Sequence, residues 1–368
     1  MELRCGALEG LVIMDKQFWN GKKVLITGHT GFKGSWLSLW LQHLGANVSG
    51  FSLPSPTKPS LFEVANVAAN MYSITGDVRD LEHLKMGISD RRPEIIIHMA
   101  AQSLVRYSYA NPVETYSTNV MGTVNVLEAI RFSENVRVVI IVTSDKCYKN
   151  NEWLWGYREN DPMGGQDPYS SSKGCAELIT SSYINSYFSK EDYGSHGVAV
   201  ASVRAGNVIG GGDWAKDRLI PDIMSAVKES QPVVIRNPNS MRPWQHVLEP
   251  LNGYLILAKK LWESGPSHVG AWNFGPNDDE AKPVLWIVER ILKMWGNGTK
   301  WKLDEGAHPH ESNYLTLDST KARRLLGWSP KLRLHTALEW IVDWYLNHQQ
   351  NSNMRHFSEA EIKRFEDL

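Results

Sequence analysis

Residues 23–34 have the sequence KVLITGHTGFKG, and this stretch decides the fold. Its residues 24–26 form a short apolar run of the kind that is buried on both faces of a parallel sheet. Glycines follow at even spacing, and from Trp36 to Leu44 the apolar positions recur with a helical period. The order of strand, glycine-rich turn and helix predicts an α/β protein with a doubly wound parallel sheet.

The glycines of this turn also indicate what the turn binds. Residues without a Cβ allow a tight turn, close approach of backbone N–H groups to a pyrophosphate, and close packing of helix on strand. A phosphate bound there meets the positive N-terminus of the following helix. Glycines also occur in ordinary turns, but the flanking strand and helix favour a dinucleotide site. The predicted cofactor-binding residues of the turn are Gly28, Thr30, Gly31, Phe32, Lys33 and Gly34.

Composition and charge argue against several functional classes. The chain has 368 residues, of which 42% are hydrophobic, and a formal net charge of −1. This length suggests two domains, and the near-neutral charge argues against a nucleic-acid or anionic membrane partner. No apolar run reaches the ~18–20 residues of a membrane-spanning helix. The three cysteines are too scattered for a disulfide framework or a zinc site, and His308 and His310 lack further ligands. We therefore expect no metal and a cytoplasmic protein.

The apolar pattern divides the chain into two parts. Residues 15–205 alternate buried strands with helices and predict a nucleotide-binding domain of the Rossmann type. Residues 206–348 combine glycine- and proline-rich loops with helices and predict a smaller, mixed substrate-binding domain, although parts of 236–275 are expected to return to the first domain. Residues 1–14 are expected to be an extension, or to precede a native start at Met14. Residues 349–368 are expected to be a tail that ends in a short charged helix or is frayed.

The ends of the predicted strands supply further cofactor contacts, because ligands of open α/β sheets bind at the carboxyl edge. Asp77 and Val78 follow the third strand, where a carboxylate can meet the adenine amino group. The segment Ala100-Ala101-Gln102 follows the fourth strand and lets a cofactor lie against the backbone. The second strand ends at Phe51-Ser52-Leu53, without the acidic residue that usually holds the adenosine ribose. The motif alone therefore leaves NAD against NADP open.

Tyr169 and Lys173 are four residues apart on a predicted helix and therefore share one face. Lowering the pKa of a phenol from about 10 to near 7 requires about 4 kcal/mol, and a neighbouring ammonium and a nicotinamide cation both favour the phenolate. Such a pair is common on protein surfaces, but here it follows a glycine-rich turn and lies 25 residues after Ser144 at a strand end. We predict that Ser144 hydrogen-bonds the substrate hydroxyl that Tyr169 deprotonates.

The glycine-rich turn, together with Ser144, Tyr169 and Lys173, resembles the corresponding motifs of the extended short-chain dehydrogenase/reductase family. The resemblance extends over residues 22–346. Within that family, residues 143–148 (TSDKCY) are similar to the active-site segment of the nucleotide-sugar 4,6-dehydratases. The dTDP-glucose enzymes carry an Asp-Glu pair there, whereas Asp145-Lys146 matches the CDP-glucose enzymes. Further similar segments lie at residues 29–36, 116–123, 206–214 and 242–247.

The resemblance implies dehydration of CDP-glucose with NAD as cofactor, within deoxysugar biosynthesis of the O-antigen type. It implies that Tyr169, assisted by Ser144 and Lys173, deprotonates the glucose 4-hydroxyl. Asp145 is the implied acid at the C6 hydroxyl and Lys146 the implied base at C5. A lysine base must be neutral, so its pKa would have to fall through burial or a cationic neighbour. Otherwise Lys146 only stabilises the enolate, and another group takes the proton.

The same resemblance implies the remaining contacts and the assembly. The implied sugar-nucleotide ligands are Ser103, Asn207, Arg218, Leu219 and Arg242, and the implied cofactor ligands include Asn119, Tyr169 and Lys173. Helices predicted at residues 113–132 and 169–188 are similar to those that pair across dimers of the family, so we expect a homodimer.

Three alternative functions remain open: a nucleotide-sugar 4-epimerase, a 4,6-dehydratase for another sugar nucleotide, and a non-catalytic dinucleotide-binding protein. An epimerase has no need of the acid–base pair Asp145-Lys146. A binding protein has no need of Ser144, Tyr169 and Lys173 together, which counts against the third alternative.

Overall fold

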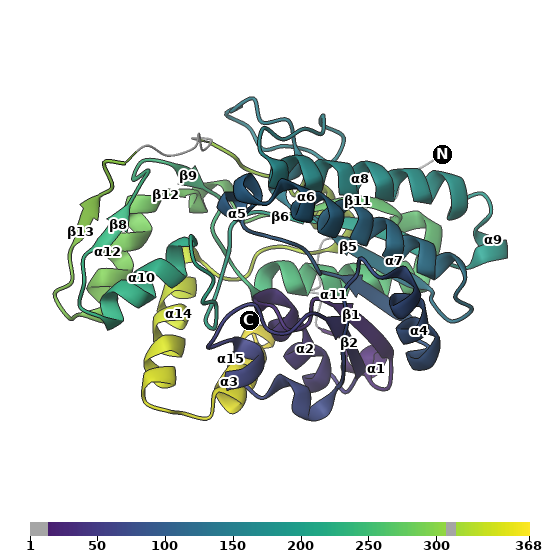
Figure 1. The fold of residues 1–368 in the computed structure, drawn as a ribbon, viewed down its shortest axis with the longest axis horizontal. Helices are drawn as coiled ribbons and strands as arrows, with labels where there is room; N and C mark the ends of the chain where they lie inside the picture. Colours follow the sequence, from purple (N-terminus) through teal and green to yellow (C-terminus); the bar gives the residue numbers. More distant parts are fainter. Residues whose placement is uncertain (1–13, 307–313) are drawn as a thin grey trace.

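The computed structural model describes residues 14–306 and 314–368 (Figure 1). The expected N-terminal extension up to residue 13, and His308 and His310, lie outside these ranges. At the centre is a seven-stranded sheet in which every neighbouring pair of strands is parallel. In sheet order its strands are β11 (Gly270–Phe274), β6 (Ala199–Ala205), β5 (Val138–Val142), β4 (Ile95–His98), β1 (Lys23–Thr27), β2 (Asn47–Ser52) and β3 (Tyr72–Thr75).

The strand order places the glycine-rich turn at the centre of the sheet. From β1 the chain runs outward through β2 and β3, then crosses back to β4 on the other side of β1. The order therefore reverses between β1 and β4, and the crevice outside their carboxyl ends is where ligands bind in open α/β sheets. The doubly wound parallel sheet predicted from residues 23–34 is confirmed.

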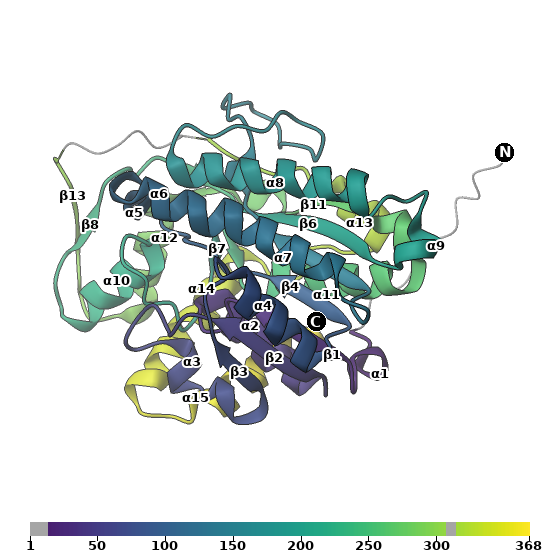
Figure 2. The ribbon, with the colours of Figure 1, turned by 45° about the vertical axis from the view of Figure 1, so that its right-hand side comes forward.

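Alternate side chains of the central strands form two cores, one on each face of the sheet. Val24 and Ile26 of β1 point to one face and join a cluster with α2 (Phe32–His43), α11 (Leu248–Ser264) and α15 (Met354–Glu366). Leu25 points to the other face and packs with α4 (Leu81–Arg91), α7 (Gly122–Arg131) and α8 (Pro168–Tyr187), which lie side by side in Figure 2. Burial on both faces explains why these strands are continuous apolar runs.

The smaller part of the chain stands beside the carboxyl edge of the sheet (Figure 1). It contains three short strand pairs, β7 (Val208–Ile209) with β10 (Gln245–His246), β9 (Met241–Arg242) with β12 (Lys282–Pro283), and β8 (Val233–Ile235) with β13 (Trp301–Leu303). Its helices are α10 (Leu219–Lys228), α12 (Val284–Trp295) and α14 (Leu334–Gln349), whereas α13 (Thr320–Leu326) packs against β11 and α11 at the edge of the central sheet (Figure 2). Apolar residues of α10, α12 and α14 belong to the same buried cluster as β1 and α2, so one continuous core joins the two parts.

The helix predicted at residues 113–132 contains a wider turn. It consists of α6 (Pro112–Tyr116), a π-helical segment (Ser117–Met121) and α7. Such segments are frequent near functional sites because they re-aim side chains. The remaining short helices are α1 (Lys16–Trp19), α3 (Leu61–Val64), α5 (Val105–Ala110) and α9 (Tyr193–His196). Across the described ranges, no helix has both the length and the apolar character that crossing a membrane requires.

The C-terminal segment is an ordered part of the core. Helix α15 packs against α2, and the ring of Phe365 lies edge-on to Trp40 with 5.6 Å between centroids. The Trp40 indole also donates to Glu366 at 2.8 Å. Where the sequence left open a short charged helix or a frayed tail, the structure has the helix α15 at Met354–Glu366. Buried residues at helical spacing, among them Ile362 and Phe365, cause this docking.

Replacing Phe365 by alanine tests the packing of α15. The side chain is fully buried, so Phe365→Ala is expected to lower the free energy of unfolding by about 3–5 kcal/mol. Urea denaturation measures the change. Phe132→Ala is the matched control, because the Phe132 side chain is 68% exposed and its removal is expected to change stability by no more than about 0.5 kcal/mol. Equal effects of the two substitutions would contradict the packing described here.

Candidate active site

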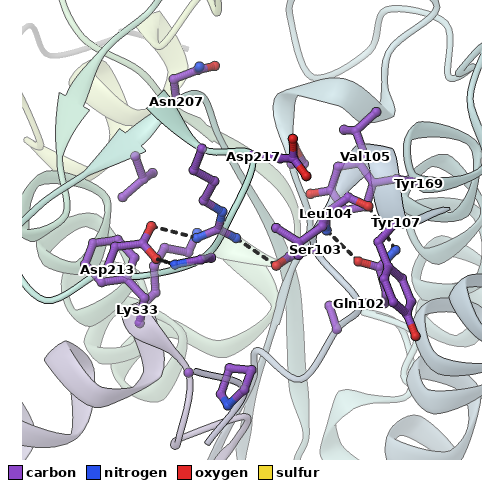
Figure 3. Close-up of a pocket in the computed structure, with 18 of the residues that line it drawn as sticks. Lys33, Gln102, Ser103, Leu104, Val105, Tyr107, Tyr169, Asn207, Asp213 and Asp217 are labelled. Carbon is purple, nitrogen blue, oxygen red and sulfur yellow. Dashed lines mark hydrogen bonds and ion pairs between the residues drawn. The ribbon is translucent and has the colours of Figure 1, made fainter. Parts of the chain in front are cut away.

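A cavity of about 1370 Å³ opens at the carboxyl edge of the sheet (Figure 3). This volume exceeds the about 300–1,000 Å³ of a typical single small-molecule site, so there is room for two ligands. The turn after β1, the ends of β2 to β5, the start of α8 and the smaller part of the chain all contribute to its walls. Every predicted catalytic, cofactor-binding and substrate-binding residue lines this cavity except Asn119.

The glycine-rich turn forms a cradle that side chains would fill. Gly28 has φ +78°, and a Cβ there would lie 2.7 Å from the backbone nitrogen of Ala100. A Cβ on Gly34 would lie 2.2 Å from the Gly28 carbonyl oxygen. Gly31 caps α2 without a side-chain hydrogen bond, which leaves the first N–H groups of this helix for a ligand. The turn therefore fits a pyrophosphate at the start of α2.

Hydroxyl groups lie at the end of β2, where the acidic residue that usually holds the adenosine ribose is absent. The Thr30 hydroxyl donates to the Leu53 carbonyl at 2.9 Å and lies 2.9 Å from the Ser52 hydroxyl. Asp77 is the nearby carboxylate at the end of β3, and its Oδ1 accepts from the Arg79 backbone at 2.9 Å. The Arg79 guanidinium also lowers the pKa of Asp77, so this carboxylate is ionised at neutral pH.

Asn119 lies behind the cavity wall and acts on it through its neighbours. Its Oδ1 accepts from the backbone N–H of Gln102 at 2.9 Å, and its Nδ2 donates to the Gln102 carbonyl at 2.9 Å. The same Nδ2 donates to the Ser172 hydroxyl on α8 at 2.8 Å. Asn119 therefore joins the π-helical segment to the Ala100-Ala101-Gln102 wall and to α8. Its predicted role as a direct cofactor ligand stays a prediction.

A short turn after β5 holds the side chains at the centre of the site. Ser144 is extended and accepts from the backbone N–H of Lys146 at 3.2 Å, which caps the 3₁₀ turn Asp145–Cys147. The Ser144 hydroxyl donates to Asp145 Oδ1 at 2.9 Å. From the facing helix α8, Lys173 donates to the Val142 carbonyl at 3.2 Å. The turn and α8 thus bring together the residues that the sequence placed 25 positions apart.

Burial controls the protonation of these groups. It raises the pKa of Tyr169 to about 12, although the Ser144 hydrogen bond opposes this. It lowers the pKa of Lys173 to about 8 and that of Lys33 to about 7. Without a further positive charge, Tyr169 is therefore a neutral phenol at physiological pH.

Burial likewise raises the pKa of Asp145, against the opposing effects of Lys146 and the Ser144 hydrogen bond. Its Oδ2 is buried and has no hydrogen-bond partner within the described part of the chain. A carboxyl group in this environment favours its protonated form and can donate a proton. Lys146 lines the same cavity and is only partly buried.

Several ion pairs lie among the residues that line the cavity. Arg218, at the start of α10, donates to Asp213 Oδ2 at 2.9 Å and to the Ser103 hydroxyl at 2.7 Å. Figure 3 shows Asp213 and Ser103 at the ends of the dashed lines that mark these two contacts. Asp217 lies 3.6 Å from an Arg106 guanidinium nitrogen and 3.7 Å from one of Arg236.

Sequence reasoning found Ser103 and Arg218 but missed their charged neighbours. Asp213 stood within the similar segment 206–214, which was an available signal. Asp217, Arg106 and Arg236 carried no such signal, because their pairing depends on the approach of helix α5 and two loops that are distant in sequence. In residues 14–306 and 314–368, no three His, Cys, Asp or Glu side chains form a group that could hold a metal.

Comparison with known proteins agrees with this arrangement. A family model described as GDP-mannose 4,6 dehydratase matches residues 25–340. The chain belongs to this family. A curated relative, the CDP-glucose 4,6-dehydratase of Salmonella typhimurium, is 55% identical over 353 residues, which are 96% of this chain and 98% of the relative.

Solved structures of low sequence identity share the fold of this GDP-mannose 4,6-dehydratase family member. The epimerase Mth375 of Methanothermobacter thermautotrophicus has a TM-score of 0.79 at 24% identity, covering 92% of this chain and 96% of that one. A dTDP-glucose 4,6-dehydratase of Bacillus anthracis, in complex with NAD, has a TM-score of 0.74 at 22% identity, covering 90% and 99%. The predicted fold class is confirmed.

Proposed function

We propose that this protein dehydrates CDP-glucose to CDP-4-keto-6-deoxyglucose with NAD as its cofactor, a step of deoxysugar biosynthesis. The observation that carries the proposal is the Asp145-Lys146 pair, which lies in one cavity with Tyr169 and the glycine-rich turn. An acid–base pair beside a redox site fits an elimination and has no purpose in a 4-epimerase or a binding protein. The 55% identity to a CDP-glucose 4,6-dehydratase supports the same reaction and the same nucleotide.

The cavity suits NAD together with a sugar nucleotide. Its glycine cradle would hold the pyrophosphate, Asp77 and Val78 the adenine end, and Tyr169 and Lys173 the nicotinamide end. When bound, NAD supplies a hydride acceptor at C4 of the sugar and returns the hydride at C6. The nicotinamide cation also supplies the positive charge that Tyr169 lacks in the protein alone.

The oxidation step uses Ser144, Tyr169 and Lys173. Tyr169 takes the proton from the glucose 4-hydroxyl as the C4 hydride leaves, and the Ser144 hydroxyl orients that oxygen. Lys173 stabilises the phenolate with its ammonium charge. The resulting 4-ketone acidifies the C5 hydrogen and so prepares the elimination.

The elimination step uses the two residues of the turn after β5. Asp145 donates a proton to the C6 hydroxyl, which leaves as water, and its raised pKa keeps this proton available. Lys146 lines the cavity beside it and is proposed to take the C5 proton or to stabilise the enolate. Loss of water across C5–C6 gives the alkene to which the hydride returns at C6, while C5 takes up a proton in place of the one removed.

The sugar nucleotide is proposed to bind between the two parts of the chain. Arg218 and Arg242 suit its diphosphate, because guanidinium groups make charge-assisted, bidentate hydrogen bonds to phosphate oxygens. Asn207, Ser103 and Leu219 line the same region of the cavity. Arg218 holds Asp213 and Ser103 in the protein alone and would exchange one of them for a phosphate oxygen.

Mass spectrometry of the product tests the proposal. The protein is incubated with catalytic NAD and, in parallel, with CDP-, UDP- or dTDP-glucose. Loss of one water from the CDP sugar, with NAD unconsumed, is the expected result. Loss of water from another sugar nucleotide alone would reassign the substrate. An unchanged mass with an altered sugar would indicate an epimerase, and no conversion despite bound NAD would favour the binding protein.

A homodimer through α6, α7 and α8 is part of the proposal. These helices pack side by side, and Val113, Met121 and Leu178 are 81%, 49% and 61% exposed. Light scattering is expected to give a dimer for the unmodified protein and a monomer for Leu178→Asp, because a carboxylate cannot be buried unpaired. Leu325→Asp on α13, where the leucine is 59% exposed, is the control and is expected to stay dimeric. A monomeric unmodified protein would contradict the proposal.

We propose the cytoplasm as the compartment. Cys147 and Cys175 are free thiols, and Cys147 is buried. Burial raises the pKa of the Cys147 thiol well above its usual value, so this cysteine is unreactive packing rather than a nucleophile. Free thiols agree with a reducing compartment.

A further inference from the structure

Glu177 continues the face of α8 that carries the proposed active-site residues. Tyr169, Lys173 and Glu177 are each four residues apart, so they lie one above another on the helix. The Glu177 side chain is only 4% exposed and contacts Thr143, which lines the cavity. A carboxylate is almost never buried to this degree unless it is paired, and the reaction described so far gives it no role.

Both oxygens of the Glu177 carboxylate accept hydrogen bonds from residues on or next to two neighbouring strands. The Thr143 hydroxyl of the turn after β5 donates to its Oε1, and the Ser202 hydroxyl of β6 donates to its Oε2 at 2.7 Å. Arg204 of β6 forms an ion pair with Oε2 at 2.7 Å, and its own side chain is 4% exposed. The carboxylate therefore carries its charge within the core.

Arg204 extends these contacts around the turn after β5. Its second guanidinium nitrogen donates to the Tyr148 hydroxyl at 2.6 Å, and that hydroxyl donates to Asn273 on β11 at 2.7 Å. Thr143 directly precedes Ser144, and Tyr148 directly follows the 3₁₀ turn. The Glu177–Arg204 pair thus holds both ends of the turn that bears Asp145.

The same carboxylate is the anionic neighbour that favours a charged Lys173. Burial lowers the pKa of Lys173 to about 8, and Glu177 is the principal group that opposes this. The other titratable groups that act on Lys173 are Lys33 on α2, His98 on β4 and Cys147 in the 3₁₀ turn, and Tyr169 is one helical turn before it on α8. Lys33 repels the ammonium, and burial keeps the Cys147 thiol and the His98 ring neutral.

We propose that Glu177 is a positioning residue for the dehydration: its buried carboxylate keeps Lys173 charged beneath Tyr169 and holds the turn that bears Asp145. The inference rests on the proposed function, since Lys173 has this task only if Tyr169 acts as the base. It predicts that the charge of Glu177, and not only its shape, determines the pH range of activity.

Glu177→Gln tests the charge, because glutamine preserves the volume and can still accept from Thr143. Without the carboxylate the pKa of Lys173 falls further, and a lysine is charged only below its pKa. Activity is therefore lost at lower pH than in the unmodified protein. The alkaline limb of kcat/KM is expected to move by about one pH unit toward acid, which is a loss of about tenfold at a pH on that limb.

Two further variants separate the charge from damage to the fold. Glu177→Gln leaves Arg204 unpaired and can destabilise the protein, whereas Glu177→Gln with Arg204→Met removes both buried charges. The double variant is expected to show the same alkaline shift. Ser202→Ala removes one hydrogen bond to the carboxylate without changing charge, and its alkaline limb is expected to coincide with that of the unmodified protein. Urea denaturation of each variant measures its stability separately.

Binding of NAD supplies a readout that needs no turnover. Quenching of tryptophan fluorescence by NAD is titrated across the same pH range. As pH rises, binding is expected to weaken at a lower pH in both variants that lack Glu177 than in the unmodified protein. If the unmodified protein converts no sugar nucleotide, the proposed function fails, and this titration still tests Glu177. An unshifted alkaline limb in the double variant, in turnover and in NAD binding, would overturn the inference. A shift confined to the single variant would do so as well, since it would originate from unpaired Arg204.

Discussion

Tyr169→Phe is expected to lower kcat for CDP-glucose by about 10³-fold, within the range that a single acid–base group contributes. The substitution removes one oxygen atom, the phenolic group proposed to take the proton from the 4-hydroxyl. Because the dehydration begins with that proton transfer, oxidation and elimination are expected to fall together. Initial rates of water loss, followed by mass spectrometry, measure the effect.

The pH dependence of the rate provides a second test of Tyr169 as the base. Tyr169 acts as a base only when ionised, and its pKa is about 12 in the protein alone. The rate is therefore expected to rise with pH until the phenol of the complex with NAD and substrate is ionised. Tyr169→Phe is expected to lack this acidic limb in whatever activity remains. A residual rate that kept the limb would assign the base to another residue.

Tyr183→Phe is the matched control for the tyrosine substitution. Tyr183 is on the same helix, and its hydroxyl contacts Glu128 at 3.3 Å, away from the cavity lining. Loss of this hydroxyl is expected to leave kcat unchanged. Retained NAD binding in Tyr169→Phe would show that the site is intact. A similar loss of activity in both variants would point to damage to α8 instead of loss of a base.

The fold could be predicted from sequence because its decisive signals are local. The run at residues 24–26 is buried on both faces of the sheet, so it could be recognised without knowing its partners. Gly28 and Gly34 are required by contacts within the same βα unit or with the adjacent strand end. Ser144 and Asp77 were found for a related reason, since residues that follow parallel strands meet at one edge.

The features that could not be predicted from sequence depend on contacts between segments that are distant in the chain. Helix α15 packs where the Trp40 ring contacts Phe365 and the Trp40 indole N–H donates to Glu366, more than 300 residues later in the chain. The mixed composition of the C-terminal segment did not predict this contact. The contact of Asn119 with Gln102, which joins the π-helical segment to the cavity wall, also had no signal in the sequence. Glu177 was overlooked because its partners lie directly after β5 and on β6, and only the folded sheet brings them to α8.

Asp145→Asn is expected to slow the loss of water by about 10²–10³-fold while leaving the earlier chemistry intact. The amide preserves the shape of the side chain but cannot donate a carboxylic proton to the C6 hydroxyl. Burial raises the pKa of Asp145, so the protonated form persists to higher pH than for an exposed aspartate. Protonated Asp145 is therefore expected to be lost as pH rises through this pKa, and Asp145→Asn is expected to keep only the alkaline limb that Lys173 causes.

Exchange of the C5 hydrogen in deuterium oxide distinguishes this step from oxidation. With Asp145→Asn, the 4-ketone still forms and the C5 proton still leaves, so CDP-glucose recovered after incubation is expected to carry deuterium at C5. Lys146→Ala supplies the comparison. If Lys146 is the C5 base, that variant loses exchange and elimination together, whereas exchange without elimination would limit Lys146 to a role after deprotonation. Full elimination by Asp145→Asn would remove Asp145 from the chemistry. The proposal would then leave unexplained why a buried carboxyl group lines the cavity with an Oδ2 that has no hydrogen-bond partner in the described part of the chain.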